Sequence, residues 1–273
     1  MHESGEPVAA GAAEKACVER LDDAARLCGR LGHDFDNILM GLLGFAELAR
    51  AQVQSGTRAA TYLDEMFTVA ETAREVTRQL HLFNRCGRPN PFPTGLADVC
   101  DRNGLRETLG LPANVEVRTA LQEDLPKVGI SPDTLAAIVG QLVRNAAEAM
   151  PEGGPVVLTA RPVSVSERIV DMLPAPIEPG GYVELTVADA GAGVPADFLH
   201  RIGREPFVTN KPRHRGLGLP TVLRALQAHG GGLRIESSSH GTAVVVYLPT
   251  LELLPRSSVP VDGTPAALEV ASQ

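Results

Sequence analysis

A histidine is followed closely by two carboxylates in the stretch LGHDFDNIL, residues 31–39. An exposed neutral imidazole is a competent nucleophile near pH 7, because its unperturbed pKa is about 6.5. The adjacent Asp34 carboxylate could keep one nitrogen of the His33 ring protonated and leave the other to attack. Asn37 shares a helical face with His33, where its amide could orient a phosphoryl oxygen or a water molecule. These residues suit phosphoryl transfer, although a solvated surface cluster is the ordinary interpretation of a single His-Asp pair.

Two stretches after residue 140 have the residue types of a nucleotide site. In QLVRNAAEAM, Asn145 follows Gln141 by four residues within a predicted helix, and an inward-facing amide there suits Mg²⁺ with phosphate oxygens. In DAGAG, which follows an apolar strand, Asp189 can accept a hydrogen bond from an exocyclic amine such as that of adenine. Gly191 and Gly193 would let the backbone approach a flat ligand.

Two further stretches complete this pattern. TNKPRHRGLGL, residues 209–219, places Gly216 and Gly218 at the start of a predicted helix, where free N–H groups favour phosphate. Three basic residues add positive charge to this loop: Lys211, Arg213 and Arg215. HGT, residues 240–242, forms a tight turn between predicted strands. Each stretch is weak evidence alone, but their order and spacing together favour a nucleotide site. The P-loop class is excluded, because no GxxxxGK[ST] occurs.

The reactive histidine lies in a region that we predict to be helical. Apolar residues before residue 84 recur there at alternating steps of four and three, which is the pattern of packed helices. The first series is Leu31, Phe35, Ile38, Leu42, Phe45, Ala49 and Gln52 or Val53. The second series is Tyr62, Met66, Val69, Ala73, Val76, Leu80 and Phe83. A polar break at QSGTR joins them into a predicted antiparallel hairpin, in which His33 takes the most solvent-exposed heptad position. A lone hairpin exposes its seam, so we expect two copies to pair into a dimeric four-helix bundle.

The chain changes character at NRCGRPNPFPTG, residues 84–95, where prolines and glycines break any helix. Beyond it, helices and strands alternate, which predicts an α/β sandwich with a mixed sheet covered by helices on one face. The predicted strands are VEVRTAL, PVVLTARPVSV, YVELTVADA and a final hairpin that turns at His240-Gly241. We expect four segments: a disordered lead-in 1–14, a helical hairpin 15–88, the sandwich 89–252 and a disordered tail 253–273.

Composition narrows the classes of partner and compartment. The net charge is -8 and the isoelectric point about 5.4, with no basic run, which argues against nucleic acid or anionic membranes as partners. The four cysteines show no CxxC spacing, so we expect reduced thiols without a metal. No apolar stretch of about 18 residues and no signal pattern occurs, which predicts a cytoplasmic protein.

Taken as a set, these motifs resemble the transmitter half of a two-component sensor histidine kinase of the soluble nitrogen-regulation type. HDFDNIL resembles the H-box of that family, LVRNAAEAM its N box and DAGAG its G1 box. EPFVTNKP resembles the F box, GLGL the G2 box and GTAVVVYLP the G3 strand. The resemblance covers roughly residues 17–250 and leaves almost nothing for a sensor domain. It implies that the hairpin carries the phosphoacceptor and that the sandwich binds ATP.

The resemblance also implies a role for each matching residue. His33 would accept the phosphoryl group, Asp34 would act as base or orienting acid, and Asn37 would serve both this step and dephosphorylation of the partner. Asn145, with Gln141 in place of a usual asparagine, would hold Mg²⁺, and Asp189 would bind adenine. The other implied ATP-binding residues are Gly191, Gly193, Lys211, Gly216, Leu217, Gly218 and Thr242. The phosphoryl group would pass to an aspartate of a response regulator on a separate chain.

Three positions depart from the family pattern. Besides Gln141, the lid carries His214-Arg215 before GLGL, and Asp36 replaces a usual asparagine beside the acceptor. The altered lid keeps an alternative open, namely a histidine phosphotransferase or scaffold whose nucleotide pocket is vestigial. A serine kinase or another ATPase with the same fold is a weaker alternative, because neither explains a histidine with an acid and an amide on one helical face.

Overall fold

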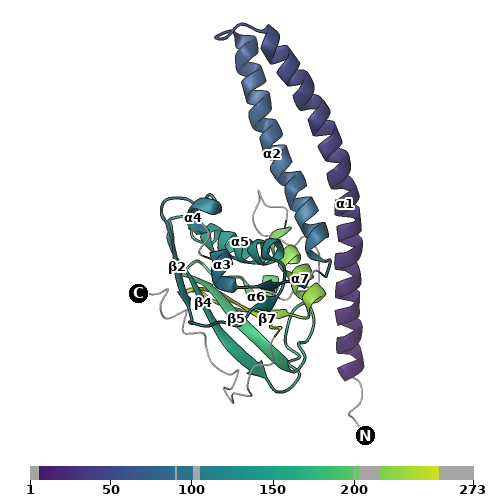
Figure 1. Cartoon of the computed structure of the whole chain (residues 1–273), viewed down its shortest axis with the longest axis vertical. Coiled ribbons are helices and arrows are strands. Elements are labelled where there is room, and N and C mark those ends of the chain that lie inside the picture. Colours follow the sequence, from purple (N-terminus) through teal and green to yellow (C-terminus); the bar gives the residue numbers. More distant parts are fainter. Residues whose placement is uncertain (1–5, 90, 101–104, 200, 203–215, 252–273) are drawn as a thin grey trace. The chain divides into compact units, whose positions relative to one another are not determined.

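A computed structural model describes residues 6–89, 91–100, 105–199, 201–202 and 216–251 (Figure 1). One compact unit comprises Asp22–Arg85, and the rest of the chain forms the other. Within the described ranges, no helix combines the length and the hydrophobicity needed to cross a membrane.

Two long antiparallel helices, α1 (Glu6–Gln52) and α2 (Arg58–Cys86), form the predicted hairpin (Figure 1). The buried apolar side chains of α1 in this unit are mostly small and share one side of the helix: Ala25, Cys28, Leu39 and Ala46. Two glycines add to this row. A Cβ on Gly29 would collide with the side-chain amide of Asn84, and a Cβ on Gly32 would lie 3.1 Å from Cε1 of His81. Small residues therefore let α2 approach α1 closely.

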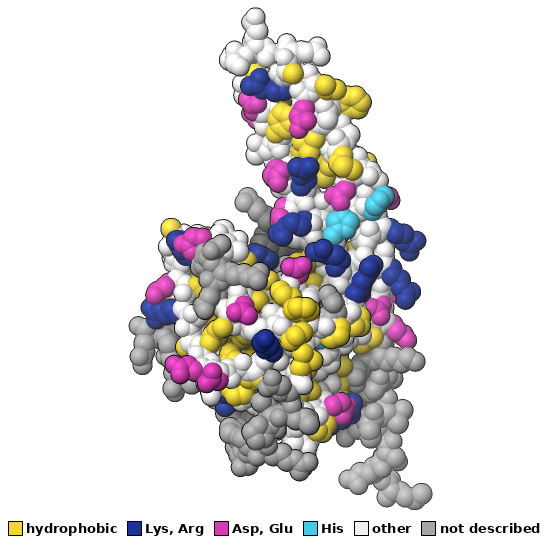
Figure 2. Space-filling model, viewed as in Figure 1, with side chains coloured by type: hydrophobic (Ala, Val, Ile, Leu, Met, Phe, Trp, Pro, Cys, Tyr) yellow, Lys and Arg dark blue, Asp and Glu magenta, His cyan; other side chains and the backbone are white. Residues whose placement is uncertain are grey.

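A second apolar row on the hairpin remains exposed. In α1 it comprises Leu27, Leu31, Phe35, Ile38, Leu42, Phe45 and Leu48, and α2 adds Tyr62, Met66 and Val69. Figure 2 shows such hydrophobic side chains at the surface of the hairpin. The first heptad series read from the sequence therefore lies in this exposed row rather than in the contact between α1 and α2, whereas the second series runs from the row to the buried Phe83. We refer to these ten residues as the exposed apolar row.

The start of α1 differs from the expected lead-in. The helix begins at Glu6, so residues 6–14 are helical rather than disordered. Alanine and glutamate are strong helix formers, and extending an existing helix avoids the cost of nucleating a new one. Residues 1–5 and the tail 253–273 lie outside the described residues.

The second unit contains the predicted mixed sheet. Its five strands stand in the order β2 (Val115–Leu121), β4 (Gly154–Val165), β5 (Gly180–Asp189), β7 (Gly241–Pro249) and β6 (Gly232–Ser238). The β2 and β4 pair is parallel, and the other pairs are antiparallel. Two helices, α5 (Pro132–Glu148) and α7 (Gly218–His229), pack against each other on one face of the sheet (Figure 1). The sequence did not indicate the short elements β1 (Pro93–Thr94), β3 (Val128–Gly129), α3 (Leu96–Cys100), α4 (Leu105–Thr108) and α6 (Ala196–Leu199).

Local signals set the ends of α5 and α7. Ser131 occupies the N-cap of α5 and Pro132 follows in the first turn, but the Ser131 hydroxyl donates to Oγ1 of Thr134 (3.0 Å) rather than capping the backbone. The helix α7 ends at Gly230, whose φ of 73° is the left-handed conformation that glycine adopts without strain. A proline at the start of α5 and a glycine just after α7 therefore mark one end of each helix.

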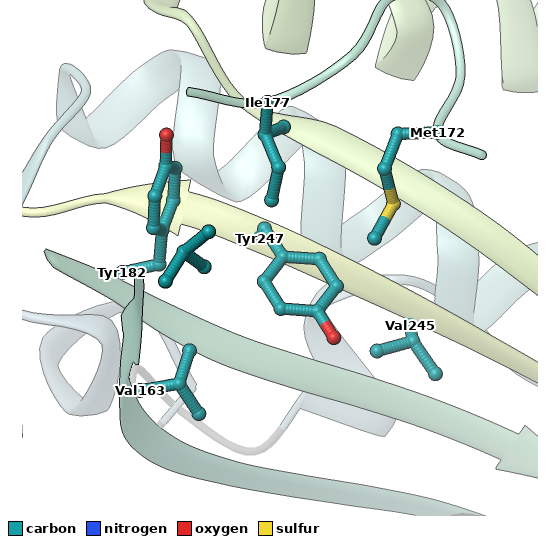
Figure 3. Close-up of a cluster of buried hydrophobic side chains, with 7 residues drawn as sticks. Val163, Met172, Ile177, Tyr182, Val245 and Tyr247 are labelled. Atoms are coloured by element: carbon teal, nitrogen blue, oxygen red, sulfur yellow. The ribbon is translucent and has the colours of Figure 1, made fainter. Parts of the chain in front are cut away.

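The Pro-rich insert between β4 and β5 packs against the sheet instead of leaving it bare. It contributes Met172 and Ile177 to a buried cluster with Tyr182 and Tyr247 (Figure 3). The remaining members of this cluster are Val163, Val165 and Val245. Backbone pairing of Ile169 with Ile177 closes the insert on itself. Pairing of Leu173 with Leu233 holds the insert against β6.

A polar network lies beside this cluster. Glu184, itself buried, accepts a hydrogen bond from Nε of Arg161 (2.7 Å) and another from the hydroxyl of Tyr247 (2.9 Å). Burial, together with the nearby Glu184 carboxylate, raises the pKa of the Tyr247 hydroxyl well above its usual range. Tyr247 therefore stays protonated and keeps donating to Glu184.

The cluster predicts that the insert contributes to stability. We expect Ile177→Ala to lower the free energy of unfolding by about 2–4 kcal/mol, because it leaves a cavity under a fully buried side chain. Val170→Ala is a matched control in the same insert, and we expect it to change stability by less than about 0.5 kcal/mol, because Val170 is exposed. Urea unfolding of the full chain measures both, and equal effects would contradict the role of the insert.

Candidate functional site

The side chain of His33 is on the surface of α1, with 75% of it exposed. Histidine side chains are visible at the surface of the hairpin in Figure 2. The Nδ2 atom of Asn37 lies 3.3 Å from Nδ1 of the ring, and Oδ1 of Asp34 lies 3.7 Å from the same nitrogen. The hairpin therefore brings together the three residues expected at this position, and both neighbours lie on the Nδ1 side of the ring.

In the other unit, Asp189 ends β5 with its side chain buried. Its Oδ1 accepts hydrogen bonds from the backbone N–H of Gly191 (2.9 Å) and of Thr242 (3.3 Å). The second bond follows from the register of the sheet, in which Asp189 stands opposite Thr242 on β7. These two bonds stabilise the charge of a buried carboxylate and fix its orientation.

Two glycines of DAGAG sit where a side chain would not fit. A Cβ on Gly191 would lie 2.6 Å from the carbonyl oxygen of Ala149. Gly193 has a φ of 75°, and a Cβ on it would collide with the carbonyl of Ser238. The loop after Asp189 is therefore closely packed between α5 and the β6–β7 turn, which keeps the carboxylate in place.

The amides of α5 meet the start of α7. Gln141 is buried and Asn145 is half-buried one turn later. A Cβ on Gly218, the first residue of α7, would lie 3.1 Å from Oε1 of Gln141 and 3.4 Å from Oδ1 of Asn145. The structure thus brings the second glycine of GLGL beside both amides. Their oxygens, next to the N–H groups of a helix start, suit a cation with bound phosphate.

Some of the other expected ATP-binding residues are described by the structure, and some are not. Gly216 has a φ of 65°, and Leu217 is buried at the N-cap of α7. Lys211 and the departures His214 and Arg215 lie outside the described residues.

Sequence reasoning missed Ser237 on β6. Its hydroxyl oxygen accepts from the backbone N–H of Val194 (2.7 Å) and lies 3.2 Å from Oγ1 of Thr242. Ser237 therefore links the loop after Asp189 to β7. A serine within the run SSS carries no local signal that marks it, so only the strand pairing could have revealed it.

Comparisons with known proteins agree with this arrangement. Residues 130–252 match the family described as histidine kinase-, DNA gyrase B-, and HSP90-like ATPase. The chain is 28% identical over 242 residues to the sensor kinase CckA of Brucella abortus (strain 2308). It is 29% identical over 231 residues to the sensory histidine kinase/phosphatase NtrB of Rhizobium leguminosarum bv. phaseoli. The chain is related to the transmitter module of two-component sensor histidine kinases.

The alignments cover most of this chain but not most of its relatives. They span 87% of the chain and 25% of CckA, and 82% of the chain and 57% of NtrB. A solved structure of full-length ShkA in complex with AMPPNP has the same fold, with a TM-score of 0.62 and 23% identity over 86% of this chain and 48% of that one. The predicted fold class, a pair of long helices followed by a mixed sheet with helices, is confirmed. The family match also supports nucleotide binding by the sandwich.

The geometry of Asp189 leads to a prediction for nucleotide binding. We expect Asp189→Asn to weaken binding of a fluorescent ATP analogue by about 100-fold or more. The amide oxygen can still accept from Gly191 and Thr242, so the NH₂ group then faces the ligand, and a donor would meet the exocyclic amine of adenine.

The control for this variant is Asp171→Asn, an exposed carboxylate of the insert, which should bind the analogue like wild type. Circular dichroism should show both variants folded. Unchanged affinity in folded Asp189→Asn would contradict the assignment of Asp189.

Proposed function

We propose that this chain is an ATP-dependent protein-histidine kinase that autophosphorylates His33. The observation that carries the proposal is an exposed imidazole with Asp34 and Asn37 beside its Nδ1, on a chain that also contains a histidine-kinase-like ATPase domain. In the reaction, Nε2 of His33 attacks the γ-phosphorus of ATP. A nitrogen–phosphorus bond forms, the bond from that phosphorus to the β–γ bridging oxygen breaks, and ADP leaves.

The neighbours of His33 support attack by Nε2. This attack needs the tautomer with a proton on Nδ1, so that Nε2 holds the lone pair. The Asp34 carboxylate, 3.7 Å from Nδ1, favours a proton there and stabilises the positive charge that the ring gains on attack. Rotation of the Asn37 amide brings its oxygen to the same N–H group. Asp34 would therefore act as the orienting acid, with Asn37 as a second holder of the ring.

The sandwich supplies the ATP site in this proposal. Asp189 would accept from the adenine amine, with Thr242 beneath it, and the start of α7 at Gly218 would face the phosphates. The carbonyl oxygens of Gln141 and Asn145 fit Mg²⁺, which prefers oxygen ligands and keeps several waters. When bound, Mg²⁺ neutralises charge on the phosphates.

Two partners follow from this function. A second copy of the chain would cover the exposed apolar row, whose large side chains are otherwise in contact with water. A response regulator on a separate chain would take the phosphoryl group onto an aspartate. The relatives CckA and NtrB are by name a sensor kinase and a sensory histidine kinase/phosphatase, which supports a response regulator as the partner of this chain.

Labelling with ATP tests the enzymatic proposal. Incubation of the full chain with γ-labelled ATP and Mg²⁺ should give acid-labile, alkali-stable label in wild type and none in His33→Gln, which removes the nucleophile. His229→Gln, a change of another histidine on α7, should label like wild type. Wild-type labelling in His33→Gln would contradict the assignment of the acceptor. Label that appears only after another kinase is added would favour the phosphotransferase alternative.

Sedimentation tests the dimer. We expect Phe45→Asp to convert the dimer to a monomer, because it places a charge at the most exposed side chain of the exposed apolar row. Glu47→Ala, two residues away on an exposed polar position, should remain dimeric. Wild-type protein that sediments as a monomer at micromolar concentration would rule out the proposed assembly.

A further inference from the structure

A polar cluster links the two helices of the hairpin beside His33, and the mechanism above does not use it. Oδ2 of Asp36, on α1, lies 2.6 Å from Nε2 of His81, on α2. Thr77, a buried residue one turn before His81, lowers the pKa of the same carboxylate. The carboxylate is therefore bound by the His81 side chain of the opposite helix.

The helical period explains why Asp36 can reach either helix face. At about 100° per residue, Asp36 lies roughly 60° from His33 and roughly 60° from the row of small residues that contacts α2. Residues three apart on a helix are neighbours, with Cβ atoms about 5–6 Å apart. A free carboxylate at position 36 would thus be able to turn toward His33. In the structure it turns toward α2.

Gly32 provides the space for this contact. It lies one turn before Asp36 on the same face, and a Cβ there would come within 3.1 Å of Cε1 and 3.3 Å of Nε2 of His81. Glycine inside a helix costs about 1 kcal/mol relative to alanine. This cost is offset here, because the glycine leaves room for the imidazole that contacts Asp36. Gly32, Asp36 and His81 therefore act together as one arrangement.

We propose that His81 is a positioning residue for phosphoryl transfer, which holds the Asp36 carboxylate against α2 and away from the phosphoryl group that arrives at His33. The inference rests on the proposed kinase function. Its physical basis is charge: ATP brings several negative charges to His33, and a carboxylate one helical turn away repels them unless it is bound elsewhere.

The charge of Asp36 is present under working conditions. The Thr77 hydroxyl and the hydrogen bond with His81 lower the pKa of Asp36, and the charges of His81 and His33 lower it further. The carboxyl is therefore ionised at neutral pH. An asparagine at this position would need no such partner, whereas an aspartate does.

The test compares three variants of the full chain and one control variant with wild type. His81→Ala should lower the rate of His33 labelling at saturating ATP by about three- to tenfold with an unchanged KM for ATP, since the freed carboxylate repels the phosphoryl group. His81→Ala with Asp36→Asn should recover the wild-type rate, because the charge is gone. Asp36→Asn alone should label at least as fast as wild type.

The control removes a different polar contact of the same hairpin. Arg50 donates from Nε to Oδ1 of Asp64 (3.0 Å), and it lies about 25 Å along α1 from His33. If His81 acted only by stabilising the hairpin, Arg50→Ala and His81→Ala should slow labelling alike. We expect Arg50→Ala to label normally. The defect of His81→Ala should also shrink at about 1 M salt, where the screening length is about 3 Å.

A second phosphoryl donor separates this inference from the proposed kinase function. Phosphoramidate phosphorylates exposed imidazoles without the ATPase domain: its phosphorus–nitrogen bond breaks, a bond to His33 forms, and ammonia leaves. Phosphorus NMR should show the same order of rates among the variants. Wild type that reacts with phosphoramidate but not with ATP would refute the kinase and still test His81. Equal rates for His81→Ala and wild type with both donors, or no recovery in the double variant, would overturn the role of His81.

Discussion

The roles of the hairpin depend on which residues lie on which side of the helix α1. At about 100° per residue, the small residues of α1 from Ala25 to Ala46 share one direction. The exposed apolar row of α1 centres about 100° to one side of them, and His33 lies about 120° to the other side. Contact with α2, an apolar face for a second copy and a water-facing imidazole therefore coexist on one helix. Insertion of a single residue would rotate everything beyond it by about 100° and place the wrong face outward.

A comparable constraint governs the sandwich, where strand register rather than helical phase sets the site. Asp189 receives the N–H of Thr242 only because β5 and β7 pair with these residues opposite each other. Ser237 stands opposite Thr242 on the next strand and reaches the N–H of Val194. Shifting a strand by one residue would turn its side chains to the other face. The buried carboxylate is thus held by the whole central sheet.

Periodicity explains how much of the fold was predictable. The heptads predicted the hairpin, and the alternating strands with a proline-led helix predicted the order of elements in the sandwich. Those signals are local, and they fail where contacts between distant segments decide the outcome. The heptads did not indicate the contact between α1 and α2, because α1 contacts α2 through alanine, cysteine and glycine, which hydrophobic patterns underweight. The packing of Ile177 on the sheet and the link through Ser237 depend on pairings that no local pattern encodes.

The departure at position 36 shows why a substitution in a motif has to be read with its tertiary neighbours. From the sequence, Asp36 only adds charge beside the acceptor. In the structure, that charge is matched from α2 by His81 and Thr77, which are 45 and 41 residues away in the chain, and Gly32 makes the match sterically feasible. An aspartate here without a partner on α2 would face the incoming phosphates, and a larger residue in place of Gly32 would crowd the ring of His81. The three positions are therefore coupled, and changes at one of them should alter the effect of changes at the others more than additivity allows.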